Sequence, residues 1–423
     1  MQEKQNDFTK NSMAYNIMSL AIPMTIAQLI NVLYSLVDRM YIGHLAQNST
    51  LALTGLGITF PIIMLVTAVT NLFGMGGAPL CSIARGRGDD ERAEKIIGNS
   101  FAMLIICSCI LIIIGLVMKK SLLYLFGASD NAQGFAKKGM LTILIGAIIN
   151  IILDPIFIFG LDLGIKGAAI ATVIAQFISA SWVLHFLFSD KAIYRIKKSC
   201  MKLDFKLIKE IVSLGFSGFV FATTGSLVQI VCNNVLLFWG GNIYVGIMTV
   251  LNSIRDVLQM TIEGIRSGAQ PVISYNYGAG QYLRVRQGIK FLTKIALLYT
   301  SIAWCILDFF PEFFIHLFNS EEEMLLLGVP ALHIYFLGFF MMAFQSAGQT
   351  TFISLGMGKY ATFFSLFRKV ILVIPLTIFL PNLWDLGVYG VFYAEMISNF
   401  VGGIACFSTM MMVVWRRLGK LNK

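Results

Sequence analysis

The chain has 423 residues, of which 57% are hydrophobic and only 13% are charged, and its formal net charge is +10. Soluble domains carry about 25% charged residues, so a soluble protein of this composition would expose apolar patches large enough to aggregate. The composition therefore predicts an all-α polytopic membrane protein. The positive charges lie in short loops between apolar segments, which is typical of cytoplasmic loops, so we expect no nucleic-acid partner.

Eleven apolar segments along the chain are long enough to cross a bilayer. They are too long and continuous for barrel strands, so all are predicted to be helices. No signal peptide is expected, because residues 1–10 are polar and the first apolar segment continues to span length. The predicted spans are Met13–Leu36, Thr54–Gly74, Phe101–Met118, Met140–Gly160, Gly167–Phe188, Ile211–Trp239, Ile243–Ile265, Phe291–Phe310, Val329–Gly356, Ala361–Leu380 and Val388–Trp415.

An internal repeat relates the two halves of the chain. An offset of 192 residues places GGAPLCSIARGRGDDERA (76–93) on GAQPVISYNYGAGQYLRV (268–285). Each copy is predicted to end the second span of its half, to break the helix at a proline, to turn at Gly-X-Gly and to meet headgroups through an arginine. A phosphate-binding loop is not expected, because no Walker lysine follows. The motif residues are Gly76, Pro79, Gly86, Gly88, Gln270, Pro271, Asn276, Gly278 and Gly280.

The repeat predicts two membrane bundles, of which the first lacks one span. After residue 129 the offset changes to 220, which aligns Pro155 with Pro375, so the first half is shorter by 28 residues, the difference between the offsets. Charge placement agrees, because the basic linker reaches the cytoplasm only if a sixth span precedes it. The predicted domains are the N-terminal bundle 1–188, the cytoplasmic linker 189–209, the C-terminal bundle 210–415 and the basic cytoplasmic tail 416–423.

Three stretches carry a resemblance to a known family. They are LVDRMYIGHL (36–45), NIILDPIFIFGLDLGIKGAAIAT (150–172) and GAQPVISYNYGAG (268–280). Together with the repeated halves they resemble the multidrug and toxic compound extrusion (MATE) family along nearly the whole chain. The departure from the family pattern is the missing fourth span, which in the family lines the cavity of the first half.

The resemblance implies a fold and an activity. Two homologous six-span helical bundles, the first of them short by one span, would enclose a V-shaped cavity. Small organic cations and drugs would be exported by alternating access, in exchange for H⁺ or Na⁺. The protein would be a monomer that crosses the bacterial cytoplasmic membrane several times and contacts its lipids. We expect no cofactor, and no metal beyond a coupling Na⁺. We also expect no enzyme activity, because no His, Cys and Ser constellation converges.

Four residues of the first half are predicted to form the coupling site. The resemblance implies that Asp38 binds the cation or takes the proton, and that Thr172 supplies a nearby hydroxyl. Asn150 and Asp154 are four residues apart and share a helix face, and Pro155 frees a carbonyl beside them. Such hard oxygen ligands suit Na⁺ or a proton relay.

Each of these residues also has an ordinary structural interpretation. Asp38 can pair with Arg39 or reach water at the helix end. Asn150 and Thr172 can make interhelical hydrogen bonds, and Asp154 can cap the break at the proline.

The substrate cavity is predicted to be lined by residues of both halves. Ionisable groups inside spans are functional hypotheses by default. In the second half Arg266 can pair with Glu263, and internal ion pairing is the favoured interpretation there, with a second cation or drug site as the alternative. Glu395 is a similar but weaker candidate. The 21 Met and 34 Phe residues suit either promiscuous cation binding or ordinary helix packing. The cavity candidates are Gln28, Asn31, Tyr34, Asp256 and Glu263.

Two other functions compete with drug export. A lipid-linked sugar flippase of the same superfamily would place more cations inside the cavity, whereas the charge within the spans of this chain is scarce and roughly balanced. A truncated, inactive membrane paralogue is favoured by the missing span.

Overall fold

The computed structural model describes residues 7–43, 49–125, 174, 177, 198–318, 322–383 and 385–421. The elements of these residues are helices, and no strand occurs among them. The principal helices are α1 (Met13–Gly43), α2 (Ser49–Gly86), α3 (Asp90–Leu125), α7 (Phe205–Gly278), α8 (Tyr282–Phe309), α9 (Pro311–His316), α10 (Glu322–Phe336), α11 (Met342–Ser354), α12 (Gly358–Leu366), α13 (Ile374–Phe379), α14 (Tyr389–Met410) and α15 (Arg416–Lys420).

Short helical segments of other types connect these elements. The 3₁₀ segments are η2 (Lys198–Met201), η3 (Phe339–Met341) and η5 (Leu380–Asn382). The segments η4 (Phe367–Val373) and η6 (Met411–Trp415) are π-helical. The segment η4 joins α12 to α13, and η6 joins α14 to α15, so both lie within long, nearly continuous helices.

The prediction of a polytopic all-α membrane protein is confirmed. Among the described residues, seven helical ranges are long and apolar enough to cross a membrane. One of them, α7, holds two predicted spans on either side of Gly241, whose φ of 71° and ψ of −168° break the helix. Two predicted spans lie outside the described residues, apart from residues 174 and 177: Met140–Gly160 and Gly167–Phe188. The region 129–139, where a span is predicted to be missing, also lies outside them.

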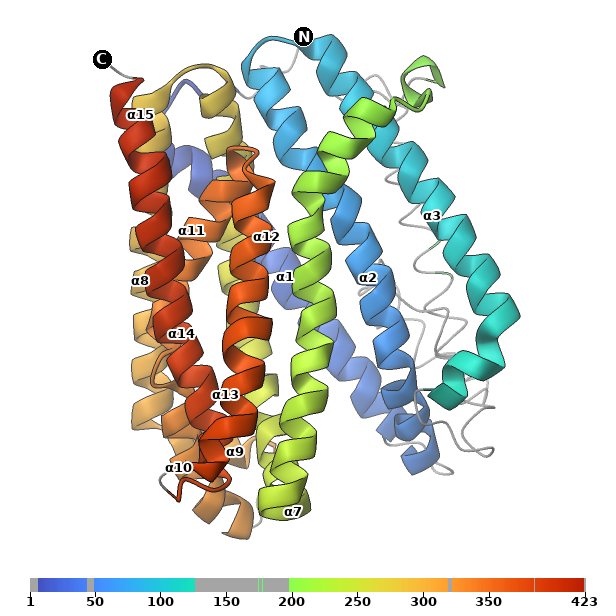
Figure 1. Cartoon of the computed structure of the whole chain (residues 1–423), viewed down its shortest axis with the longest axis vertical. Coiled ribbons are helices and arrows are strands. Elements are labelled where there is room, and N and C mark those ends of the chain that lie inside the picture. The colour runs from blue at the N-terminus through green and yellow to red at the C-terminus, as the bar shows by residue number, and fades with distance from the viewer. Residues whose placement is uncertain are drawn as a thin grey trace.

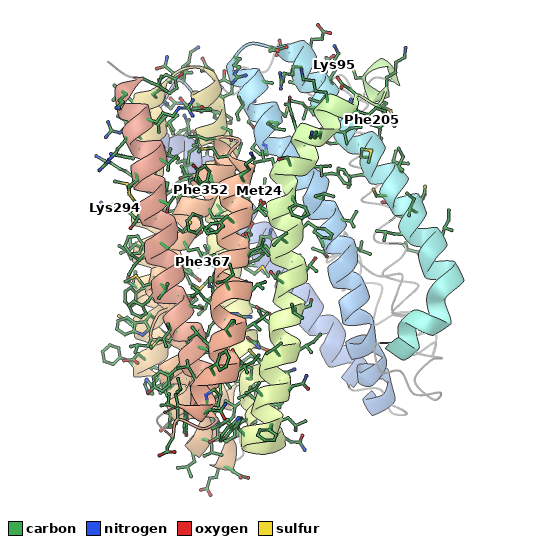
Figure 2. The ribbon with its side chains drawn as sticks, in the orientation of Figure 1. Met24, Lys95, Phe205, Lys294, Phe352 and Phe367 are labelled. Carbon is green, nitrogen blue, oxygen red and sulfur yellow. The ribbon has the colours of Figure 1, made fainter. Side chains whose placement is uncertain are left out.

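The helices pack as two groups on either side of α7. Figure 1 shows α2 and α3 on one side of α7, with α8, α12 and α14 on the other. Both chain termini are marked at the same end of the molecule, where the labelled Lys95 and Phe205 also lie (Figure 2). Phe352 of α11 is fully buried and stacks on Phe364 at 5.9 Å between ring centroids, inside the second group.

The predicted helix breaks at Pro79 and Pro271 are wrong. Helix α2 continues through Pro79 to Gly86, and α7 continues through Pro271 to Gly278. A proline removes one hydrogen bond of the helix, whereas ending the helix inside a bilayer leaves several backbone groups without partners. The smaller loss is tolerated, so the turns come only after the helices end. There Gly88 and Gly280 have φ values of 75° and 71°.

Glycines allow the helices of the two halves to touch. A Cβ at Gly76 would meet the carbonyl oxygen of Ile211, and one at Gly215 would meet that of Leu72, so α2 and the start of α7 cross in backbone contact. A Cβ at Gly268 would meet the backbone of Ala21 in α1 in the same way. Each half therefore packs its second span against the first span of the other half.

The predicted span Val329–Gly356 is interrupted in the structure. Helix α10 ends at Phe336, the 3₁₀ segment η3 follows, and α11 begins at Met342. The helix α11 is unusually polar for a buried segment, and Gln345, Gln349 and Thr350 are all buried. Residues before the break belong to one apolar core, and residues of α11 belong to a second core that includes α8 and α14.

Candidate functional site

The predicted coupling site of the first half lies almost wholly outside the described residues. Asp38 belongs to α1, of which the backbone but not this side chain is described. Asn150, Asp154 and Thr172 fall outside the described residues. Their joint role stays a prediction.

The same holds for most of the cavity residues predicted on α1. The side chain of Gln28 is half-buried, whereas for Asn31 and Tyr34 only the backbone is described. The three residues lie along one stretch of α1, whose first turns pack against α7 through Gly264 and Gly268. Their position places this part of α1 at the junction of the two halves.

The predicted pair between Glu263 and Arg266 is present in the structure. The Nη1 atom of Arg266 lies 2.9 Å from Oε2 of Glu263, and its Nε donates to Oγ1 of Thr350 at 3.0 Å. This second contact joins α7 to α11. Glu263 itself is partly exposed. The pair therefore fixes Arg266 between two helices and leaves one carboxylate edge open.

Glu395 is the centre of a buried ion cluster that connects three elements. The Nη2 atom of Arg368 in η4 donates to Oε1 of Glu395 in α14 at 2.5 Å. The Nη1 atom of Arg255 in α7 lies 3.9 Å from the same oxygen. Lys369, the residue after Arg368, is buried as well. Because breaking a buried ion pair leaves an uncompensated charge, this cluster locks the three elements together.

The π-helical segment η4 carries two consecutive charged residues that are both buried. Such π-helical turns are frequent at functional sites. Neither Arg368 nor Lys369 was predicted as a functional residue. The signal was the charged pair in FRKV (367–370), inside the predicted span Ala361–Leu380.

A chain of polar side chains extends from this cluster along α7. Arg255 donates from Nη1 to the hydroxyl of Tyr335 at 2.6 Å, and that hydroxyl donates to Oδ1 of Asn252 at 3.0 Å. Asn252 then donates to Oε1 of Gln229 at 2.8 Å, and Gln229 donates to Oδ1 of Asn233 at 2.9 Å. The chain joins the two parts of α7 on either side of Gly241 and ties both to α10.

Asp256 marks the open end of this network. Its Oδ1 lies 3.8 Å from Nη2 of Arg255, and its side chain is largely exposed. Asp256 and Glu263 were predicted to line the substrate cavity, and their spacing of seven residues places them on one face of the helix. Both are exposed or partly exposed on α7 and seven residues apart, so they offer two acidic groups on one side of that helix.

The repeated motif forms a junction at the end of the molecule that carries the termini. The guanidinium of Arg85 lies over the rings of Phe8 and Tyr275, at 5.8 and 5.4 Å from their centroids. Asn276 is fully buried and donates to the carbonyl of Phe8 at 3.1 Å. The N-terminal segment 7–11 therefore lies between the two copies of the motif.

Arg284 is also part of this junction. The prediction that the motif arginines meet lipid headgroups is wrong. Its Nη2 donates to the carbonyls of Phe8, Lys10 and Asn11 at 2.9, 3.2 and 2.9 Å, and its Nε donates to Asn276 at 3.0 Å. In the first copy Arg92 pairs with Glu210 at 2.6 Å. Both arginines were expected to meet headgroups, but they bind the protein, because backbone carbonyls and a carboxylate lie within reach.

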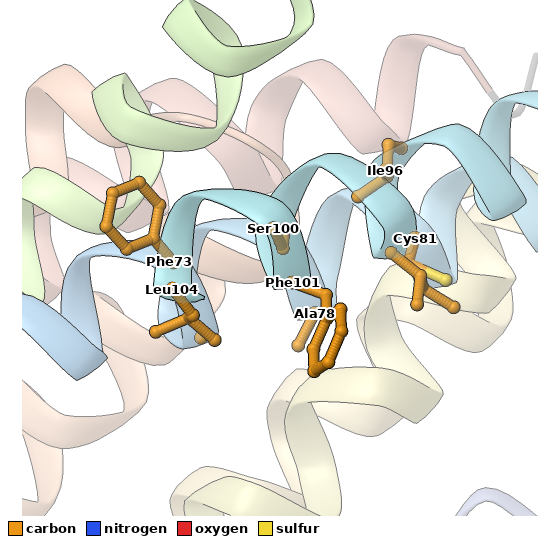
Figure 3. Close-up of a pocket in the computed structure, with 10 residues that line it drawn as sticks. Phe73, Ala78, Cys81, Ile96, Ser100, Phe101 and Leu104 are labelled. Carbon is orange, nitrogen blue, oxygen red and sulfur yellow. The ribbon is translucent and has the colours of Figure 1, made fainter. Parts of the chain in front are cut away.

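A cavity of about 430 Å³ lies between α2 and α3 and is almost wholly apolar. Figure 3 shows Phe73, Ala78, Ser100 and Leu104 around it. None of its described lining residues is charged, so they offer no ion-coupling chemistry. The lining residues are Phe73, Gly74, Gly77, Ala78, Cys81, Ile96, Ile97, Ser100, Phe101 and Leu104.

Comparisons with known proteins agree with this architecture. The MatE family model matches residues 23–190 and 219–379. The multidrug export protein MepA of Staphylococcus saprophyticus is 22% identical, over 94% of this chain and 93% of that protein.

Solved structures show the same fold. One, described as the outward-facing conformation of a multidrug resistance MATE family transporter, has a TM-score of 0.89 at 21% identity and covers 100% of this chain and 99% of that one. The MATE multidrug transporter DinF-BH, solved in complex with a ligand, is 30% identical, with a TM-score of 0.87 and 98% of each chain covered. A family model that matches both helical groups, together with this relative, shows that the chain belongs to the MatE family.

Proposed function

We propose that this protein is a secondary-active multidrug exporter that moves small organic cations out of the cell in exchange for H⁺ or Na⁺. The observation that carries the proposal is the family match in both halves, together with the 30% identical multidrug transporter that was solved in complex with a ligand. The competing flippase function is less well supported, because the relatives reported above are multidrug transporters.

In this proposal Asp38 receives the coupling ion. Asn150, Asp154 and Thr172 supply further oxygen atoms, which suits a hard cation such as Na⁺. A carboxylate at this place also takes up and releases a proton. In either case the ion binds in the first half, and the second half serves as the partner against which the first half moves.

Alternating access requires that the two halves separate at one membrane face at a time. The contacts among Arg85, Phe8, Tyr275 and Arg284 support a closed state at the end of the molecule that carries the termini. The Glu395 cluster supports the view that the second half moves as one body, because it ties α7, η4 and α14 together. Separation of the two halves at this end would therefore break the contacts of Arg85 and Arg284, while the Glu395 cluster would stay intact.

The acidic groups of α7 favour a cationic substrate. Asp256 and Glu263 are exposed or partly exposed on the same helix, and they would attract an organic cation that enters between the halves. Gln28, Asn31 and Tyr34 of α1 would complete the cavity wall. Phenyl rings and thioethers nearby would accept drugs of varied shape.

The test is energised efflux of a fluorescent organic cation from bacterial cells that lack their other drug pumps. We expect Asp38→Asn to abolish ion-coupled efflux without loss of membrane-inserted protein. Asp385→Asn is the matched control, because Asp385 is exposed and asparagine tolerates its positive φ of 55°. Coupled efflux that is retained in Asp38→Asn would remove this residue from the mechanism.

A second arm tests the inactive-paralogue alternative. A chain that carries a grafted fourth span in the first half is compared with the natural chain at matched expression. Efflux by both chains means that the predicted missing span is dispensable. Efflux by the grafted chain alone means that the natural chain is a broken transporter, and efflux by neither overturns the proposed function.

A further inference from the structure

The buried cluster of the second half contains more positive than negative charge. Arg368, Lys369 and Glu395 are 3, 8 and 6% exposed, and Arg255 adds a third cation. Glu395 alone is a buried acid in this group, among the residues that the structure describes. A net positive charge in the interior of a membrane protein is costly unless an anion compensates it.

Hydrogen-bond donors also outnumber acceptors in this cluster. A guanidinium has five N–H donors. The carboxylate of Glu395 accepts from Arg368 and lies 3.9 Å from Arg255, which also lies 3.8 Å from the carboxylate of Asp256. Arg368 uses Nη2 on Glu395, and Arg255 uses Nη1 on Tyr335. The Nε atoms of both arginines are buried without a hydrogen-bond partner in the described part of the chain. The site therefore presents unused donors that suit a second carboxylate.

In the repeat, this cluster corresponds in position to the predicted coupling site, but its groups are cations and not oxygen ligands. The offset of 220 residues that aligns Pro155 with Pro375 also places Asn150 on Val370 and Asp154 on Ile374. Arg368 and Lys369 stand directly before Val370. The first half thus offers oxygen atoms at this position of the repeat, whereas the second half offers guanidinium and ammonium groups.

The cluster has an opening and an aromatic surround. The side chain of Arg255 is 19% exposed, and the neighbouring Asp256 is 62% exposed, so the charged group reaches the surface along α7. The guanidinium of Arg255 lies 5.9 Å from the centroid of the Tyr335 ring, which packs edge-on against Phe392. Tyr335 and Phe392 are themselves buried, so a carboxylate would approach the cluster from the side of Arg255 and Asp256.

We propose that Arg255, Arg368 and Lys369 form an anion-binding site for the carboxylate of an amphipathic organic ligand. Two of these cations already bind a carboxylate, that of Glu395. Charge-assisted bonds between guanidinium and carboxylate are about twice as strong as neutral ones. Asp256 opposes anion binding, because it repels an incoming anion and pairs with Arg255 when no ligand is bound. The site concerns binding only, so it does not depend on the direction or coupling of transport.

The experiment measures binding of pyrenebutyrate to the purified full chain in detergent by fluorescence, with pyrenebutanol as the uncharged analogue. We expect the acid to bind about tenfold more tightly than the alcohol, which corresponds to one charge-assisted hydrogen bond. Lys369→Met should weaken binding of the acid about tenfold and leave the alcohol unchanged. Lys359→Met, at an exposed lysine near the start of α12, should change neither.

A second variant is expected to gain affinity for the acid. Asp256→Asn removes the acidic group beside Arg255, so we expect the acid to bind more tightly, by about tenfold at most. Because Asp256 is largely exposed, this variant is expected to fold whatever happens to the buried ones.

Three results would overturn the anion site. They are equal affinity for the acid and the alcohol, an equal loss in Lys359→Met and Lys369→Met, and no gain in Asp256→Asn. Cation efflux that fails while pyrenebutyrate still binds would overturn the proposed function and leave this site standing.

Discussion

Gly86 at the end of α2 lies against the backbone carbonyl of Tyr275, and Gly278 at the end of α7 lies against that of Ile83. The repeat offset of 192 residues relates Gly86 to Gly278 and also Ile83 to Tyr275. The contact is therefore made twice by equivalent residues, and the two halves cross about a local two-fold relation. A side chain at either glycine would collide with a backbone oxygen, which cannot move without shifting its helix.

We expect Gly86→Ala and Gly278→Ala each to destabilise the protein by about 1–3 kcal/mol, because overpacking a helix contact forces the backbones apart. Gly74→Ala in α2 and Gly225→Ala in α7 are matched controls, since an added Cβ meets no described atom within 4 Å at either position. The controls should be neutral or slightly stabilising, because alanine favours a helix over glycine. Thermal unfolding in detergent checks the contrast, and equal effects at all four positions would contradict the crossing.

The N-terminal segment 7–11 should loosen when its anchor is removed. Arg284 donates to three backbone carbonyls of this segment, so Arg284→Met leaves those acceptors without their charged partner. We expect faster proteolysis within residues 7–11 in the native protein. Arg417→Met is the control, because Arg417 is exposed at the other end of the chain. The same cleavage rate in both variants would show that Arg284 does not hold the segment.

The same segment should be sensitive to acid through Asp7. Its carboxylate accepts hydrogen bonds from the side chain and the backbone N–H of Thr9, at 2.5 and 3.0 Å, and these hold the pKa of Asp7 below its usual value of 3.8. A lowered folded-state pKa stabilises the segment above the usual pKa, and this contribution is lost as pH falls through the lowered value.

Hydrogen exchange of residues 7–11, corrected for intrinsic rates, should therefore rise as pH falls below 3.8. Asp7→Asn should remove most of this dependence. An identical pH profile in the two proteins would contradict the role of Asp7.

The excess of cations around Glu395 predicts an asymmetry between two substitutions. Glu395→Gln removes the one buried carboxylate, which pairs with both Arg368 and Arg255, so we expect a loss of about 3–5 kcal/mol, the range for breaking a buried ion pair. Arg368→Gln leaves Glu395 with Arg255 at 3.9 Å and should cost less. Chemical unfolding of both variants gives the comparison. A larger loss for Arg368→Gln would contradict the count of charges in the cluster.

Within the described residues, the sequence predicted the membrane spans except for the break inside Val329–Gly356, because span length and hydropathy are local properties. Glu263 and Arg266 could be paired for the same reason, since they lie three residues apart on one helix. The proline breaks were wrong because bilayer depth, which decides whether a helix can end, is not visible in a motif. Arg368 and Lys369 were missed because Glu395, the partner of Arg368, is distant in the chain. The anchoring of segment 7–11 by Arg284 likewise joins residues more than 270 positions apart.

The most direct test of the central claim uses purified protein in liposomes with an imposed H⁺ or Na⁺ gradient. The measured quantity is movement of a fluorescent organic cation such as ethidium against its own gradient. We expect gradient-driven movement by the natural chain and by Asp385→Asn, and none by Asp38→Asn. Movement that is unaffected by either ion gradient, or equal in Asp38→Asn, would contradict ion-coupled drug export by this protein.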